Sequence, residues 1–166
     1  MLYEEGHFLL NDPVSKYIPE FADPQVLVSL NPADTTYTTE PARREITIRD
    51  LLAHTSGLSY GLYNERMRAI YRKADVTDGF DIRPFTIGEK MRVLADLPLA
   101  HHPGARFTYG LNTDVLGYLI EVVSGMPLDR FLDERLFTPL GMNDTHFRLP
   151  REKIPRLAAF YAETEA

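Results

Sequence analysis

The chain of 166 residues contains no cysteine. This absence excludes a disulfide framework, a thiolate metal site and a cysteine nucleophile. The sequence also lacks an apolar run of the roughly 20 residues that a membrane-spanning helix needs, and residues 1–8 have neither the basic start nor the apolar centre of a signal peptide. We therefore expect a soluble chain. Its compartment, whether cytoplasmic, periplasmic or secreted, is left open because the true N-terminus could lie upstream of Met1.

An excess of positive charge is missing too. The 18 Lys and Arg residues face 24 Asp and Glu residues, which gives a net charge of −6. The basic residues are scattered rather than clustered, so the sequence lacks the electrostatic footprint of a nucleic-acid binder. With 44% hydrophobic residues, the chain is long enough to bury one core. This predicts one domain, or a piece of a larger one, with an oligomeric state that stays open.

What the sequence does contain is a series of helix signals. Thr47 and Thr86 each have an acidic residue three positions later, which indicates capping boxes, and Asn64 can cap a further short helix. Two apolar stripes at helical spacing, over residues 115–123 and 128–136, indicate core-facing helices. Residues 1–6 are typical of the last turn of a helix that ends at a glycine. The chain as given is therefore predicted to be mainly α.

Strand signals are weak by comparison. Residues 21–44 contain three prolines and show no helical or strand period, so this stretch is predicted to be a surface loop. No convincing run of alternating strands is found elsewhere. Residues 59–85 mix aromatic side chains, charges and glycine, and we interpret them as a long excursion over an opening.

Tyr109 is the best candidate for a chemically active side chain. It lies in a glycine-flanked turn, Phe-Thr-Tyr-Gly over residues 107–110, that leads directly into the strongest helical stripe of the chain. On local sequence alone, a tyrosine in this place is usually a half-buried packing residue whose hydroxyl bonds to a carbonyl. The choice between packing and catalysis depends on the rest of the chain.

Five further stretches bear on this choice. They are Glu4-Glu5-Gly6 leading to Asp12-Pro13-Val14; residues 46–58, which read Ile-Thr-Ile-Arg-Asp-Leu-Leu-Ala-His-Thr-Ser-Gly-Leu; Pro103-Gly104 with Tyr109; Asp114-Val115-Leu116-Gly117; and Pro139-Leu140-Gly141-Met142. In this order they resemble the serine hydrolases of the β-lactamase and penicillin-binding-protein fold, most closely the class C β-lactamases and the esterases built on that fold. The resemblance covers nearly all of residues 1–166.

The resemblance implies a fold and a reaction. The fold packs a helical region against an α/β sheet region, and this chain would supply the helical region as one partial domain, with residues 59–85 as a variable loop over the active site. The reaction is acyl transfer to the serine of a Ser-x-x-Lys motif, with no cofactor and with a small-molecule ester or β-lactam as substrate. Tyr109 matches the tyrosine that accepts or relays the serine proton.

The nucleophile is missing from this chain, which contains no Ser-x-x-Lys sequence. By the spacing of the family, the serine is expected roughly ten residues before Met1, on the helix whose last turn is residues 1–5. A glycine-rich strand is expected after Ala166. The chain alone would then be inactive, as a fragment of the enzyme. The alternative is a truncated, non-catalytic scaffold or binding module.

The tyrosine loop departs from the class C pattern at Leu111, where those enzymes have the asparagine that holds the amide side chain of a β-lactam. This departure favours an ester substrate. Asn112 is one position too late for that role, and its side chain is expected to cap the following helix. The candidate substrate pocket comprises Tyr60, Tyr63, Leu111 and Asn112, although ordinary surface positions explain the two tyrosines nearly as well.

Two other features resemble catalytic or metal sites. Ser59 lies in a Gly-x-Ser-x-Gly sequence, but it follows a capped helix rather than a strand, so an α/β-hydrolase with Ser59 as nucleophile is the weaker alternative. His54 is expected to bond to local carbonyls at a helix end. The adjacent His101 and His102 lack metal-ligand spacing and are expected in a solvated loop. No metal site is therefore predicted.

Overall fold

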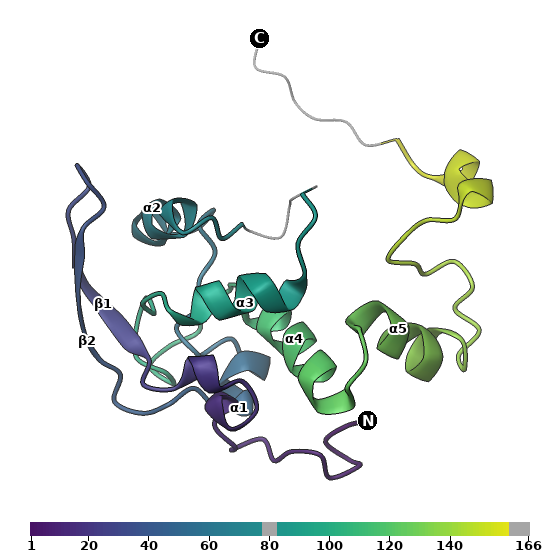
Figure 1. Ribbon diagram of the computed structural model, residues 1–166, viewed down its shortest axis with the longest axis horizontal. Coiled ribbons are helices and arrows are strands. Elements are labelled where there is room, and N and C mark those ends of the chain that lie inside the picture. Colours follow the sequence, from purple (N-terminus) through teal and green to yellow (C-terminus); the bar gives the residue numbers. More distant parts are fainter. Residues whose placement is uncertain (78–82, 160–166) are drawn as a thin grey trace. The chain divides into compact units, whose positions relative to one another are not determined.

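The computed structural model describes residues 1–77 and 83–159 (Figure 1). The chain divides into two compact units, residues 1–126 and 127–166. The first unit contains the 3-10 turns η1 (Val14–Lys16) and η2 (Pro19–Phe21), strands β1 (Gln25–Leu30) and β2 (Tyr37–Pro41), and helices α1 (Ile48–Leu52), α2 (Glu65–Lys73), α3 (Ile87–Ala95) and α4 (Asn112–Ser124). The second contains α5 (Leu128–Leu132), the π turn η3 (Asp133–Phe137) and the 3-10 turn η4 (Arg151–Arg156).

Three predicted helix starts are confirmed. Thr47 before α1 and Thr86 before α3 both form complete capping boxes, with Asp50 and Glu89 as the respective partners. Asn64 caps α2 by accepting a hydrogen bond from the backbone N–H of Met67. These side chains satisfy backbone donors that a helix leaves unpaired at its first turn, which is why their spacing is visible in the sequence.

The start of the chain has the geometry of a helix end. The N–H of His7 donates to the carbonyl of Leu2 and that of Gly6 donates to the carbonyl of Tyr3, both at 3.0 Å. Gly6 has a φ of 80°. This pair of bonds around a left-handed glycine is the Schellman motif that closes a helix.

The prediction of a surface loop over residues 21–44 is wrong. β1 and β2 pair there as an antiparallel hairpin, with an irregularity between Leu27 and Ser29. The bulge breaks the alternation of side chains along β1, and β2 is exposed along its whole length, so neither strand carries a clear period-2 pattern. Leu99 pairs with β1 through an isolated parallel bridge to Val26.

The core of the first unit lies around α4. This helix contacts both α1 and α3, and it buries Val115 and Leu119 of the predicted stripe. The helix ends at Gly125, whose φ of 69° is the left-handed conformation expected of a terminal glycine. The predicted helix over residues 115–123 is thus confirmed, although its side chains range from fully to partly buried.

The second unit is less regular than its sequence predicts. The expected helix over residues 128–136 consists of α5 followed by the π turn η3, and Phe131 is its buried hydrophobic side chain. The stretch of residues 59–85, interpreted as a long excursion over an opening, contains helix α2. Residues 78–82 of this stretch lie outside the described part of the chain. Among the described residues, no helix is both long and apolar enough to cross a membrane.

Candidate active site around Tyr109

Tyr109 is held by backbone contacts on both sides. The N–H of Thr108 donates to the carbonyl of His54 at 2.8 Å. On the other side, Gly110 lies so close to the preceding segment that an added Cβ would be 2.5 Å from Cα of Ser59 and 2.6 Å from the carbonyl oxygen of Leu58. Only glycine permits this approach without a shift of backbone. The turn that follows α1 therefore fixes the position of the Tyr109 loop.

Five rings gather at this loop, and we call them the aromatic cluster: His54, Tyr60, Tyr63, Phe107 and Tyr109. The Tyr109 ring centroid lies 5.0 Å from that of His54, 5.3 Å from that of Tyr60 and 6.4 Å from that of Tyr63. Phe107 packs on the His54 ring at 5.7 Å. Such separations are typical of favourable aromatic pairs. Tyr109 nevertheless remains 52% exposed, so its phenol can be reached from solution.

The cluster is anchored to the first turn of α4. The hydroxyl of Tyr60 donates to the carboxylate of Asp114 at 3.4 Å. Burial raises the pKa of the Asp114 carboxyl above its ordinary value, and the hydrogen bond from Tyr60 only partly opposes this. The rings of Tyr60, Tyr63 and Tyr109 are thus brought together, while their role in lining a substrate pocket stays a prediction.

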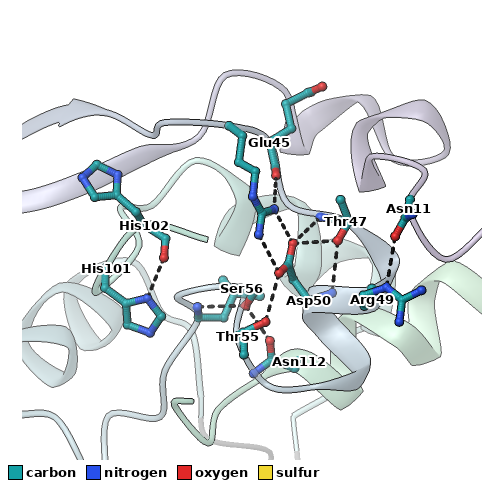
Figure 2. Close-up of polar contacts among 12 residues, drawn as sticks. Asn11, Glu45, Thr47, Arg49, Asp50, Thr55, Ser56, His101, His102 and Asn112 are labelled. Atoms are coloured by element: carbon teal, nitrogen blue, oxygen red, sulfur yellow. Dashed lines mark hydrogen bonds and ion pairs between the residues drawn. The ribbon is translucent and has the colours of Figure 1, made fainter. Parts of the chain in front are cut away.

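The other two pocket candidates are placed differently. Leu111 and Asn112 have exposed fractions of 1% and 0%. Leu111 belongs to the hydrophobic core, and the expectation that Asn112 caps α4 with its side chain is wrong, because Leu111 occupies the N-cap position without a side-chain bond. The Asn112 amide instead bonds to Ser56 and His54 (Figure 2 shows the Ser56 contact). Hydrogen bonds to residues far away in the sequence therefore occupy the Asn112 side chain, which the local sequence predicted to cap the helix.

Asp50 is the central hydrogen-bond acceptor, the hub, of the turn that carries His54. Its carboxylate accepts hydrogen bonds from Arg44, Thr47 and Thr55 (Figure 2 labels the two threonines). Burial of this carboxyl raises its pKa, but the hydrogen bonds together outweigh burial and lower the pKa to about 2. A charged Asp50 thus ties α1 to the segment before it and to the turn after it.

His54 and His101 each bond to neighbouring groups of the chain. His54 bonds to the Asn112 amide rather than to the local carbonyls that the sequence suggested. His101 is buried, so the expectation of a solvated loop is wrong for it; its Nδ1 contacts the carbonyl of His102 and its Nε2 contacts the hydroxyl of Thr108, both at 2.8 Å (Figure 2 shows the His102 contact). Burial lowers the pKa of His101. Within residues 1–77 and 83–159, no three metal-ligating side chains cluster.

Ser59 does not have the surroundings of a nucleophile. Its side chain is 1% exposed, and its hydroxyl donates to the carbonyl of Tyr60 at 3.3 Å. The segment before it is the end of α1 and a turn, not a strand. A nucleophile elbow needs an exposed serine on a strand-to-helix turn, so the geometry argues against the α/β-hydrolase alternative.

The family of the chain follows from its sequence and its fold together. The β-lactamase family model matches residues 1–166. The chain belongs to this family, in agreement with the resemblance in the sequence motifs, and its helices and short hairpin are part of the α/β fold of these serine hydrolase-like proteins.

Curated relatives and a solved structure support the same family. Protein Rv1367c of Mycobacterium tuberculosis is 38% identical over 162 residues, covering 96% of this chain and 38% of that protein. Esterase EstB of Burkholderia gladioli is 36% identical over 146 residues, covering 88% of this chain and 34% of that protein. The structure of EstCE1, a hydrolase with promiscuous acyltransferase activity, is similar with a TM-score of 0.68 and 34% identity, covering 84% of this chain and 33% of that one.

The chain is similar to only a part of each of these relatives. The chain spans about a third of the length of these relatives, with values of 38%, 34% and 33%. Within that third, the similarity shows the family to which the chain belongs. The sequence reasoning missed two parts of the site, the amide of Asn112 beside His54 and the hub at Asp50. The acidic side chain of the Thr47 capping box signalled Asp50, but no local pattern signals a contact between residues 54 and 112.

Proposed function

We propose that this chain is the helical part of a serine hydrolase that cleaves a carboxylic ester through an acyl-serine intermediate. The observation that carries the proposal is the position of Tyr109, which is exposed, fixed by backbone on both sides and surrounded by rings in a chain of this family. The nucleophilic serine and the lysine that assists it are supplied by residues outside this chain, because no Ser-x-x-Lys sequence occurs within it.

In this proposal, Tyr109 handles the proton of the serine. The serine oxygen attacks the ester carbonyl while its proton passes to the phenolate of Tyr109, directly or through the lysine. The same proton then goes to the departing alcohol, and water repeats the sequence to release the acid. An ordinary phenol has a pKa of about 10, so this role needs the positive charge of the lysine nearby.

The proposed substrate is an ester rather than a β-lactam. Leu111 stands where a class C enzyme has the asparagine that binds the β-lactam amide, and its side chain is buried in the core. The wall that remains consists of aromatic rings, which offer apolar contact and the hydroxyls of Tyr60 and Tyr63. Such a wall suits the acyl or alcohol group of an apolar ester. EstB, an esterase, supports the same choice by its similarity.

The substitution Tyr109→Phe tests the role of the phenol. In the enzyme that contains this chain together with its serine, we expect turnover of an aryl ester to fall by about two to four orders of magnitude, the usual contribution of a general acid or base. The matched control is Tyr37→Phe on the exposed strand β2, which should leave turnover unchanged. Wild-type turnover in Tyr109→Phe would end the assignment.

A second test concerns the nucleophile. The reading frame upstream of the Met1 codon should encode Ser-x-x-Lys roughly ten codons earlier, since a helix that ends at Gly6 would then carry both side chains on one face. A fluorophosphonate probe should label that serine and leave Ser59 unmodified. A stop codon in this interval would favour the non-catalytic scaffold instead.

A further inference from the structure

A chain of three hydrogen bonds runs beneath the aromatic cluster. The N–H of Leu58 donates to Oγ of Ser56 at 3.0 Å. The Ser56 hydroxyl in turn donates to Oδ1 of Asn112 at 2.5 Å, as Figure 2 shows. Nδ2 of Asn112 lies 3.0 Å from Nδ1 of His54. The side chains of Ser56 and Asn112 are completely buried, and no buried side-chain polar atom in the described part of the chain lacks a partner. Each group in this chain therefore has a defined role as donor or acceptor.

The direction of these bonds sets the tautomer of His54. The oxygen of the Asn112 amide is occupied by the Ser56 hydroxyl, so its nitrogen faces His54. An amide nitrogen can only donate, and therefore Nδ1 of His54 must accept with its lone pair. The ring proton then resides on Nε2. One buried amide thus selects one tautomer of His54.

His54 is also fixed in position by its backbone. Its φ is 54°, a left-handed conformation that is costly for a residue with a side chain and that persists only where the surroundings impose it. Its carbonyl accepts the hydrogen bond from Thr108 that holds the Tyr109 loop. Its ring packs against those of Tyr109 and Phe107, with centroid separations of 5.0 and 5.7 Å. A rotation of this imidazole would remove the surface on which Tyr109 rests.

We propose that Asn112 and His54 are positioning residues for Tyr109: the Asn112 amide holds His54 as the Nε2–H tautomer in one ring orientation, and that ring holds the phenol where it exchanges its proton. The inference rests on the proposed role of Tyr109 and adds the residues that orient it. Neither side chain needs to touch the substrate.

The size of the effect follows from what positioning contributes. A displacement of about 1 Å at a reacting group lowers a rate by about a hundredfold. Loss of the hydrogen bond from Asn112 lets the imidazole turn without unfolding the loop, because the bond from Thr108 to the His54 carbonyl remains. We therefore expect kcat to fall by about 10- to 100-fold, with KM unchanged within a few-fold.

The substitution Asn112→Asp is the sharpest test. The new carboxylate has nearly the same shape and can still accept the Ser56 hydroxyl, but it cannot donate to His54. Nδ1 of His54 must then carry a proton, which reverses the tautomer or gives a doubly protonated ring. Nitrogen-15 spectra of histidine-labelled enzyme report this at Nδ1, and the His54 signal is assigned from its loss in His54→Gln. The matched control is Asn31→Asp in the turn after β1, which adds the same charge away from the site.

His54→Gln supplies a second variant in which folding is protected. The glutamine oxygen can accept the hydrogen bond of Asn112, so no buried donor is left unpaired, but the ring that supports Tyr109 is gone. We expect the same loss in kcat and a normal thermal transition.

The outcomes separate the inference from the proposed function. An unprotonated Nδ1 in the wild type, a protonated one in Asn112→Asp and a lowered kcat in both variants support the positioning role. A protonated Nδ1 in the wild type overturns it, and so does wild-type kcat in either variant when Tyr109→Phe is impaired. If Tyr109→Phe itself keeps wild-type turnover, the proposed function fails and the positioning role fails with it, whichever tautomer of His54 is measured.

Discussion

Gly110 shows how a single residue without a side chain places the candidate site. Its Cα lies against the backbone of Leu58 and Ser59, so the methyl group of Gly110→Ala would meet backbone atoms that cannot move separately. We expect a loss of about 1 to 3 kcal/mol in the free energy of unfolding and a displaced Tyr109 that turns over esters about 10- to 100-fold more slowly. Gly141→Ala is the control for turnover, since this glycine has open space around it and its φ of 64° strains an alanine without a steric clash. Equal losses of turnover in the two variants would contradict the steric argument.

The carboxyl group of Asp50 makes the free energy of unfolding depend on pH. The hydrogen bonds from Arg44, Thr47 and Thr55 lower its pKa in the folded state to about 2, below the value of about 3.9 in an unfolded chain. The resulting stability is fully present above the unfolded pKa and is lost as the pH falls through the folded pKa. We expect Asp50→Asn to lose about 2 kcal/mol at neutral pH by chemical denaturation, with little difference from the wild type near pH 2.

The control for this substitution is Asp96→Asn at the end of α3, which should change the free energy of unfolding by less than about 0.5 kcal/mol. A deficit in Asp50→Asn that is equally large in acid and at neutral pH would show that packing, rather than charge, is what Asp50 contributes.

At the scale of elements, the capped start of α3 supports α4 from one side. α3 contacts α4, and Gly88 in its first turn lies against the ring of Tyr118. Thr86→Ala removes the side-chain oxygen that accepts the N–H of Glu89, and we expect a loss of about 1 kcal/mol by thermal or chemical denaturation. Thr86→Ser keeps that oxygen and should remain within a few tenths of a kcal/mol of the wild type. Equal destabilisation by serine would point to the methyl group instead of the cap.

At the scale of the whole chain, the exposed side chains of the aromatic cluster predict self-association of the chain. Tyr63 and Phe107 are 74% and 66% exposed, and Leu62 beside them is also exposed. Contiguous apolar side chains of this kind are usually covered by another surface. We expect the 166-residue chain to self-associate in light scattering behind size exclusion, and Tyr63→Ser with Phe107→Ser to reduce this. Exposed Leu140→Ser in the second unit is the control. A monomer at high concentration would contradict the expectation.

Local chemistry explains which parts of the fold were predictable. The capping boxes at Thr47 and Thr86 are visible in sequence because both partners lie within one helical turn, and Gly6 and Gly125 mark helix ends by their own backbone freedom. The hairpin of β1 and β2 was missed because its bulge and its exposed second strand erase the alternation on which strand prediction depends. Asn112 was misassigned because its partners lie more than fifty positions earlier.

The sequence by itself determined the helical character of the chain, the capped helix starts, the family and the choice of Tyr109, since each depends on residue types at short, fixed spacing. Only the tertiary structure decided what surrounds that tyrosine. The His54 carbonyl bonds to Thr108, the Ser59 backbone lies against Gly110, and the Tyr60 ring packs on Tyr109 itself, all from segments about fifty residues away. Close packing of buried side chains and complete pairing of buried polar atoms, as at Asn112, select that arrangement, and no local pattern encodes it.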